Sequence, residues 1–254
     1  MSYAVKRFGW LPDLPDARDY IYAAPLAMLR KLPAKVDLSG NCPPVYDQGD
    51  LGSCTGNAIA AAIEFAEMKQ RLAQVTTPSR LFIYYNERVI EHTVATDSGA
   101  MIRDGIKCVN KQGACRETTW PYRVPSFAKK PSAGAYQEGR KYLVSSYQRV
   151  TRNLTQMKGC LASGFPFVFG FTVYTSFMSA AVAKTGKLSM PRAGEKVEGG
   201  HAVLAVGYDD AQHRFIVRNS WGPGWGLKGY FTMPYAYLLD DNLADDFWTV
   251  RVVD

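Results

Sequence analysis

The spacing of apolar and polar residues changes part-way along the chain. Between residues 55 and 111, apolar residues recur every three or four positions, and charged residues fill the opposite side. This period is typical of amphipathic helices. It predicts helices over Thr55–Leu72, Leu81–Ile90 and Ala100–Lys111, with Ser53 as the N-cap of the first.

Strand patterns begin near residue 145, in short segments rich in aromatic and β-branched residues. The predicted strands are Phe165–Tyr174, His201–Tyr208, Phe215–Arg218, Gly229–Met233 and Phe247–Val253. Residues 123–139 hold several prolines and glycines and are predicted to form a loop. Helices followed by strands indicate an α+β chain with two lobes.

The first 34 residues follow neither period. Prolines interrupt them, and apolar residues such as Trp10 and Tyr22 stand between polar stretches. This pattern predicts an arm laid over the folded body rather than a domain. Two interpretations stay open: a plain extension packed on the body, or a short pro-segment that occupies or borders the functional cleft.

Charge and hydropathy exclude two classes of partner. Thirty Lys and Arg residues against 23 Asp and Glu residues give a net charge of +7, but the basic residues are scattered. Nucleic-acid binding needs a basic cluster, so no nucleic-acid partner is predicted. No apolar run approaches the roughly 20 residues of a membrane helix, and no signal-peptide pattern is visible. The compartment stays open between cytoplasmic and exported.

The chain has five cysteines, an odd number that leaves at least one thiol unpaired. No CxxC pair occurs, so neither a zinc site nor any other metal or cofactor is predicted. Cys108 and Cys115 are separated by six residues across a glycine turn. That spacing permits a disulfide but does not establish its geometry.

One cysteine has the surroundings of a nucleophile. A single cysteine is more often a buried apolar residue, but Cys54 stands at the start of a predicted helix, directly after a glycine-containing loop. The positive end of a helix lowers the pKa of a thiol and favours its nucleophilic thiolate form. Gln48 contributes an amide donor near the same turn.

A thiolate nucleophile needs a proton carrier, and the chain has only three histidines. His92 and His213 lie in polar segments and are expected at the surface. His201 opens an apolar strand after two glycines, and Asn219, which follows another apolar strand, could orient its imidazole. Taken singly, a structural histidine and an ordinary turn asparagine stay open as alternatives.

Three segments together resemble the papain-like cysteine peptidases. The first is Gln48-x5-Cys54, which ends in Gly52-Ser53-Cys54. The second is Gly200-His201-Ala202-Val203 with Gly207-Tyr208, which resembles the histidine strand of that family. The third, NSWGPGWGLKGY over residues 219–230, is similar to the family's asparagine segment. The three segments occur along the chain in the same order as in that family.

The resemblance covers about residues 35–254 and implies a two-lobed fold. A helical lobe over about residues 44–146 and a β-barrel-like lobe over about residues 147–254 would flank the active-site cleft. It implies Cys54 as nucleophile, His201 as acid and base, and Asn219 as the group that orients His201. Gln48 and the backbone N–H of Cys54 would form the oxyanion hole.

The resemblance also implies groups that contact substrate. Trp221 would shield the His201–Asn219 hydrogen bond, and Trp225 would line the leaving-group side of the cleft. The remaining expected contacts are Gly99, within the segment 97–100, and Gly200 and Ala202 beside the histidine. The chain departs from the family at Leu51 and Thr55, where cysteine and an aromatic residue are usual. Loss of the family disulfides fits a bacterial-type member.

The resulting functional hypothesis is a thiol-dependent endopeptidase that acts on protein or peptide substrates through an acyl-enzyme. An acyl transferase or amidase with the same thiol chemistry is the alternative. A non-catalytic binding module on a peptidase fold is the third interpretation, and the intact set of Cys54, His201, Asn219 and Gln48 argues against it.

Overall fold

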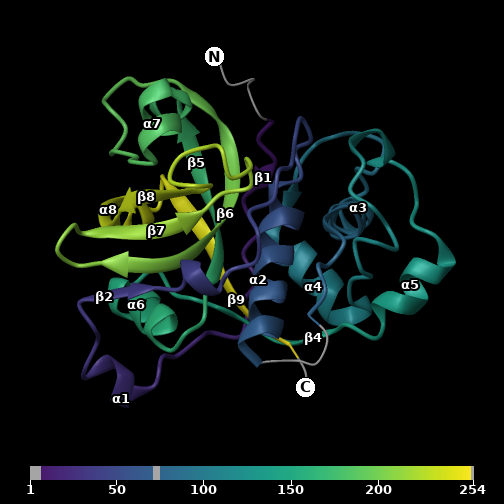
Figure 1. Cartoon of the computed structure of the whole chain (residues 1–254), viewed down its shortest axis with the longest axis horizontal. Coiled ribbons are helices and arrows are strands. Elements are labelled where there is room, and N and C mark those ends of the chain that lie inside the picture. Colours follow the sequence, from purple (N-terminus) through teal and green to yellow (C-terminus); the bar gives the residue numbers. More distant parts are fainter. Residues whose placement is uncertain (1–6, 71–74, 253–254) are drawn as a thin grey trace.

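The computed structural model describes residues 7–70 and 75–252, which form a mixed α+β arrangement (Figure 1). Helices α3 (Arg80–Ile90), α4 (Ile102–Gln112) and α5 (Ala133–Gly139) lie on one side, and the main sheet lies on the other. Helix α2 (Cys54–Gln70) runs between them. The shorter helices are α1 (Leu26–Leu29), α6 (Leu154–Ala162), α7 (Ala180–Thr185) and α8 (Tyr235–Leu239), with 3-10 turns at Ser39–Asn41, Val124–Ser126 and Thr175–Met178.

The main sheet is antiparallel at every described pairing. Its strand order is β4-β9-β5-β6-β7-β8, and β2 (Lys35–Asp37) adds to β6. The strands are β4 (Val144–Arg149), β5 (Phe167–Tyr174), β6 (Val197–Asp209), β7 (Arg214–Arg218), β8 (Tyr230–Pro234) and β9 (Ala244–Val252). Together with the helices this is the α+β arrangement that the sequence predicts.

Helix α2 is the element on which both sides pack. Its residues from Cys54 to Glu67 are all buried, so the helix has no solvent-facing stripe along most of its length. A helix that is buried nearly all round belongs inside a core, and its buried polar residues, Thr55, Asn57, Glu64 and Glu67, need partners there. Small residues, including Ala60, Ala61 and Ala62, allow β6, β9, α3 and α4 to approach it closely.

Alternation along the central strands divides the core into two parts. In β5, Phe167, Phe169 and Phe171 face an aromatic core on the outer side of the sheet. Val168, between them, faces the second core, which contains the alanines of α2. Because strand side chains alternate in direction, the continuous apolar run of β5 can fill both layers at once.

The N-terminal arm is threaded along the junction between α2 and the sheet (Figure 1). Its short strand β1 (Trp10–Leu11) pairs in parallel with β3 (Ala100–Met101). Trp10 and Tyr22 are buried, whereas Tyr20 is 74% exposed. The arm is therefore anchored through particular side chains.

Several predicted elements need correction. The helix expected over Ala100–Lys111 begins at Ile102, because Ala100 and Met101 instead pair with the arm. The expected loop over residues 123–139 contains α5, whose N-cap Ser132 accepts a hydrogen bond from the Ala135 amide. Strand β4 and helix α6 have no predicted counterpart. The predicted ends Leu72 and Val253 lie outside the described residues.

The disulfide that the sequence permits does not form, because Cys108 and Cys115 are both free. Cys108 lies within α4, and the chain turns away after the helix at Gly113, which has a positive φ of 69°. Cys115 then lies against the start of α3, where its carbonyl accepts a hydrogen bond from Ser79. The two thiols therefore belong to differently directed segments.

Tight packing between α2, α3 and α4 predicts that replacing a glycine at their interface costs more stability than replacing an exposed glycine in another helix. A methyl group built on Gly105 would overlap the carboxylate of Glu87 and the end of Ile59. We expect Gly105→Ala to lower the free energy of unfolding by about 1–3 kcal/mol. Gly134→Ala is the matched control, because Gly134 is exposed and a methyl there meets only the Ser132 hydroxyl at 3.8 Å. Urea denaturation measures both, and equal stability of the two variants would contradict the packing.

Candidate active site

Cys54 is the first residue of α2 and is 0% exposed. Its sulfur accepts a hydrogen bond of 3.3 Å from the backbone N–H of Ala202 on β6. This contact joins the central helix to the histidine strand. Ser53, the predicted N-cap, directs its hydroxyl to Tyr122 at 2.5 Å and to the amide of Asn57.

The loop before Cys54 is held by the asparagine segment. The Gln48 backbone N–H donates to the Ser220 carbonyl at 2.9 Å, and the Ser220 hydroxyl donates to Gln48 Oε1 at 2.6 Å. With its oxygen engaged, the side-chain amide directs Nε2 to the Leu51 carbonyl at 2.9 Å. Tyr122 donates to the Gln48 carbonyl at 2.8 Å. Gln48 is thus fixed by contacts on both sides of the site.

His201 and Asn219 meet through a hydrogen bond of 2.8 Å between Nε2 and Oδ1. Asn219 Oδ1 also accepts the Ser220 backbone N–H at 2.8 Å. Because this oxygen is an acceptor, the neutral imidazole carries its proton on Nε2. Nδ1 is buried and has no hydrogen-bond partner among residues 7–70 and 75–252.

Aromatic side chains enclose this pair. The Trp221 ring centroid lies 5.0 Å from that of His201. Trp225 lies behind Trp221 at 5.1 Å and packs on Phe177 and Phe231, so it is buried in the outer core. Trp221 therefore packs beside His201, which also contacts Phe171 and Phe177 of the same core, and Trp225 supports Trp221.

The structure brings the other predicted contact residues to the same junction. Gly200 and Ala202 flank His201 on β6. Gly99 has a positive φ of 78°, and a methyl group there would overlap the backbone of Gly9. The hydrogen bond to the arm comes from the next residue, since the Ala100 N–H donates to the Gly9 carbonyl at 2.7 Å.

Comparison with known proteins identifies the family. The family model for papain family cysteine protease matches residues 32–238. The chain belongs to the papain family of cysteine peptidases. An uncharacterized peptidase C1-like protein of Acanthamoeba polyphaga mimivirus is 44% identical to this chain over an alignment of 276 positions. The alignment covers 98% of this chain and 88% of that protein.

Two further relatives agree with this assignment. The crystal structure of xylellain, a cysteine protease from Xylella fastidiosa, superposes with a TM-score of 0.92 at 45% identity, covering 99% of this chain and 100% of that chain. Cathepsin B-like CP3 of Giardia intestinalis is 30% identical over 74% of this chain and 63% of its own length. This chain therefore spans less than two thirds of that cathepsin-like relative.

The papain-family site is covered by the chain's own arm. The Phe8 ring centroid lies 6.0 Å from that of His201 and 6.2 Å from that of Trp221. Gln48 Nε2 donates to the Arg7 carbonyl at 3.2 Å, and the Gly9 N–H is directed to the Cys54 sulfur. Residues 7–10 thus lie across Cys54, His201 and Gln48.

Burial under the arm opposes charge on both Cys54 and His201. It raises the pKa of the Cys54 thiol to about 12, an effect only partly offset by the N–H groups of Ala202 and Gly9. Burial also lowers the pKa of His201 to about 4, against the opposing hydrogen bond to Asn219. Near neutral pH the covered site therefore holds a thiol and an uncharged imidazole rather than an ion pair.

Thr55, where the family usually has an aromatic residue, has a distinct environment here. Its hydroxyl donates to Glu87 Oε2 at 2.7 Å, and Glu87 is fully buried on α3. Burial raises the pKa of Glu87 well above its ordinary value, which favours the protonated carboxyl. The Thr55 hydroxyl thus gives Oε2 of this buried acid a hydrogen-bond donor, whereas Oε1 has no partner among the described residues.

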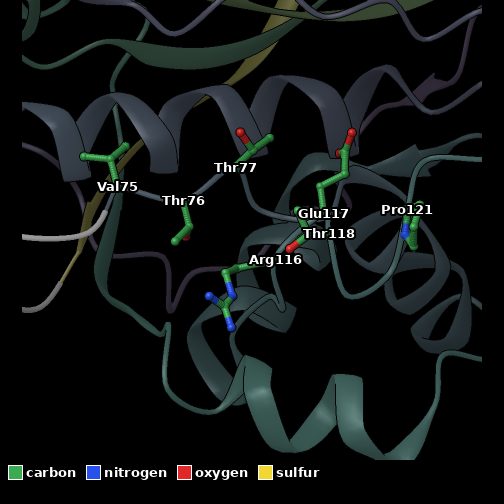
Figure 2. Close-up of a pocket in the computed structure, with 7 residues that line it drawn as sticks. All are labelled: Val75, Thr76, Thr77, Arg116, Glu117, Thr118 and Pro121. Carbon is green, nitrogen blue, oxygen red and sulfur yellow. The ribbon is translucent and has the colours of Figure 1, made fainter.

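No group of three or more metal-ligating side chains occurs within residues 7–70 and 75–252. None of the helices in that part of the chain is long and apolar enough to cross a membrane. An open pocket of about 560 Å³ lies away from Cys54, and Figure 2 shows its seven lining side chains, among them Arg116 and Glu117. Both charges are already paired, with Glu138 and Arg80 respectively, so this pocket adds nothing to the active site.

Sequence reasoning missed three groups at the site. Ser220, which orients Gln48, stood inside the recognised segment without an assigned role. Phe8 lies in the arm, where the sequence showed only scattered apolar residues and did not indicate which of them would contact the site. Asp246 had no signal at all, because it lies within the apolar strand β9 and meets Trp10 only in the folded chain, at 3.0 Å from the indole N–H.

Arm docking is predicted to depend on pH through Asp13. The Asp13 N–H donates to Asp246, and Asp13 also faces Arg103, Arg149 and Trp248. Burial, and then repulsion by Asp246, raise the pKa of Asp13 above its ordinary 3.8. With the pKa of Asp13 raised to about 7 in the docked arm, docking is favoured at low pH, and that stabilisation is lost progressively as the pH rises from about 4 to about 7.

Hydrogen exchange at the backbone amides of Trp10, Leu11 and Asp13 measures this effect. After correction for intrinsic exchange rates, protection should be lower at pH 8 than at pH 5. Asp13→Asn carries a permanently neutral side chain and should lose most of the pH dependence. Protection that rises with pH in the unsubstituted chain would contradict the assigned sign.

Proposed function

We propose that this chain is a latent endopeptidase that cleaves peptide bonds through a covalent acyl-enzyme on Cys54. The observation that carries the proposal is the enclosed junction of α2 and β6. There the helix-terminal Cys54 receives the Ala202 amide, beside an imidazole that Asn219 holds through Nε2. This arrangement leaves Nδ1 as the nitrogen available to exchange a proton with the thiol.

The proposed reaction has two steps. Once the arm is displaced, the Cys54 thiol gives its proton to His201 Nδ1. In acylation, the resulting thiolate attacks the carbonyl carbon of the scissile bond, and imidazolium His201 gives that proton to the departing amine. In deacylation, neutral His201 takes a proton from water, whose oxygen attacks the thioester carbon. The acid product then leaves, and the sulfur and imidazole return to their starting forms.

Gln48 is proposed to stabilise the oxyanion of both steps together with the Cys54 backbone N–H. The supporting observation is that Gln48 Nε2 already binds a peptide carbonyl oxygen, that of Arg7. Ser220 fixes the amide orientation by donating to Oε1, so Nε2 stays directed toward the cleft. A donor fixed before the reaction needs no reorganisation when negative charge develops.

The arm over residues 1–34 is proposed to be a pro-segment, followed by a peptidase domain over residues 35–254. Within that domain, the helical lobe would span about residues 44–146 and the strand-rich lobe about residues 147–254. The cover by residues 7–10 supports latency in two ways. It leaves Cys54 without solvent access, and it favours the unreactive thiol form.

Peptide-library cleavage tests the proposed activity. The full chain should hydrolyse peptides after the arm is displaced, and Cys54→Ala should abolish hydrolysis. Gln48→Ala should lower kcat on the order of 100- to 1000-fold, as loss of an oxyanion donor does. Ser220→Ala should lower it less, because the amide remains but loses its orienting partner.

Added amine acceptors separate hydrolysis from acyl transfer. A peptidase should give mainly the free acid, whereas a product dominated by the amine adduct would favour the acyl transferase instead. An epoxide that alkylates active thiolates provides an independent readout. Hydrolysis that persists in Cys54→Ala would refute the proposed nucleophile.

Latency predicts that displacement of the arm exposes Cys54. A methyl group on Gly9 would overlap the Gly52 carbonyl, so Gly9→Ala should weaken docking and speed epoxide labelling about tenfold or more. Gly40→Ala is the matched control, since a methyl group at Gly40 meets nothing within 4 Å. Equal labelling rates in both variants and the unsubstituted chain would show that the arm does not block the thiol.

A further inference from the structure

Tyr122, in the segment between α4 and α5, contacts the loop that carries Gln48. Its hydroxyl donates to the Gln48 carbonyl at 2.8 Å, and the Ser53 hydroxyl lies 2.5 Å from the same phenolic oxygen. Because the one phenolic proton is directed to Gln48, Ser53 is the donor of the second bond. Burial raises the pKa of Tyr122 to about 12, so the hydroxyl stays a donor near neutral pH. Tyr122 thus joins the Gln48 peptide group to the residue before Cys54.

The two peptide groups on either side of the Gln48 Cα atom are held from opposite directions. The Gln48 N–H donates to the Ser220 carbonyl at 2.9 Å, and the Gln48 carbonyl accepts from Tyr122 on the side of the helices. Because each peptide group is planar, fixing both of them fixes the direction of the Cα–Cβ bond. The Ser220 hydroxyl holds only the far end of the side chain, at Oε1. Tyr122 therefore sets where the Gln48 side chain begins, and Ser220 sets how its amide is turned.

Arg80, on α3, holds Tyr122 and the loop in one arrangement. Its guanidinium carbon lies 4.1 Å from the centroid of the Tyr122 ring. Nη1 donates to the Asp47 carbonyl at 3.2 Å and to Asn57 Oδ1, in the first turns of α2, at 3.1 Å. Glu117 accepts from Nε at 2.8 Å and from Nη2 at 2.5 Å, and such a two-point contact fixes the plane of the guanidinium. The ring of Tyr122 therefore lies on a group that is itself fixed.

Apolar packing completes the support of this loop. Leu51, where the family usually has cysteine, is 2% exposed and belongs to a small buried cluster on which Tyr122 packs. The Leu51 carbonyl accepts from Gln48 Nε2 at 2.9 Å. All five cysteines lie in the described part of the chain and are free, so no disulfide ties the loop to the helices. Its position depends on these non-covalent contacts instead.

We propose that Tyr122 is a positioning residue for the reaction, because it determines where the Gln48 amide meets the developing oxyanion. The inference rests on the proposed peptidase function and adds to that site a residue from outside the three family-like segments. Tyr122 acts through the Gln48 carbonyl rather than on the substrate. A donor that is displaced from the oxyanion loses much of its effect on the transition state. The rate of the chemical step is therefore the quantity that Tyr122 controls.

Tyr122→Phe tests the proposal in the full chain. The substitution removes the hydroxyl and keeps the ring that lies against Arg80. With a saturating peptide substrate, kcat should fall by about tenfold, because an orienting hydrogen bond of the oxyanion donor is lost. A change in arm docking cannot produce this result. Saturating substrate displaces the arm, so weaker or stronger docking alters KM but not kcat.

Tyr136→Phe is the matched control. The Tyr136 hydroxyl, on α5, donates to Asn86 Oδ1 at 2.9 Å, on the same side of the fold but away from the Gln48 loop. Its loss should cost a similar amount of stability, measured by urea denaturation, and leave kcat unchanged.

Gln48→Ala supplies the second background. Tyr122→Phe should have little further effect on kcat beside Gln48→Ala, because the amide that Tyr122 positions is gone. A merely structural tyrosine would lower kcat by the same factor in both backgrounds. That outcome, or an unchanged kcat in Tyr122→Phe alone, would overturn the proposal.

A peptide aldehyde separates this proposal from the peptidase function. If the unsubstituted chain cleaves no peptide, the peptidase function fails, but the Cys54 sulfur can still bond to the aldehyde carbon while the thiol proton passes to the aldehyde oxygen. That oxygen then takes the place of the oxyanion beside Gln48. Affinity is measured relative to the matching peptide alcohol, which cannot form the bond, so competition with the arm cancels. Tyr122→Phe should lower this ratio about tenfold, and an unchanged ratio would overturn the role of Tyr122.

Discussion

The contact between α2 and β6 is the constraint on which the rest of the structure depends. At this contact the backbone N–H of Ala202 donates a hydrogen bond to the Cys54 sulfur. The small residues of α2 permit the helix to lie against the sheet, and the alternation along β6 turns Ala202 toward the helix. The same register places His201 where Asn219 can reach it. Packing and candidate chemistry are therefore set by one helix–sheet interface.

The arm uses this interface in the manner of a bound peptide. Its backbone pairs with β3, its Arg7 carbonyl meets Gln48, and its aromatic side chains fill the spaces on either side of Gly9. The physical result is desolvation of Cys54 and His201, which opposes charge on both. Cover by the arm therefore opposes the thiolate and imidazolium forms that the proposed mechanism uses.

Local patterns predicted most of the fold because its long elements have consistent periods. The helix at Cys54 and the strands around His201 and residue 215 appear within a few residues of their expected limits. The errors occur where a distant segment decides the local structure. Ala100 is a strand residue only because the arm pairs with it, and α5 forms despite its glycines because Ser132 caps it and Ala135 is buried.

The candidate site likewise contains residues that local sequence could identify and one that it could not. Cys54, His201, Asn219 and Gln48 lie in recognisable segments, so the sequence could nominate them. Asp246 could not be nominated, because its importance comes from contacts with residues more than 230 positions away, Trp10 and Asp13. The sequence indicated an apolar arm near a cleft, but not which side chain enters which space.

The ionisation of Cys54 in the full chain tests the central claim most directly. The difference in thiolate absorbance between the unsubstituted chain and Cys54→Ala, followed across a pH titration, isolates this one sulfur from the other four cysteines. With residues 7–10 in place, no Cys54 thiolate should be present at neutral pH, because burial raises the pKa of this thiol to about 12. A full thiolate signal from Cys54 at neutral pH would contradict an arm that holds the site uncharged.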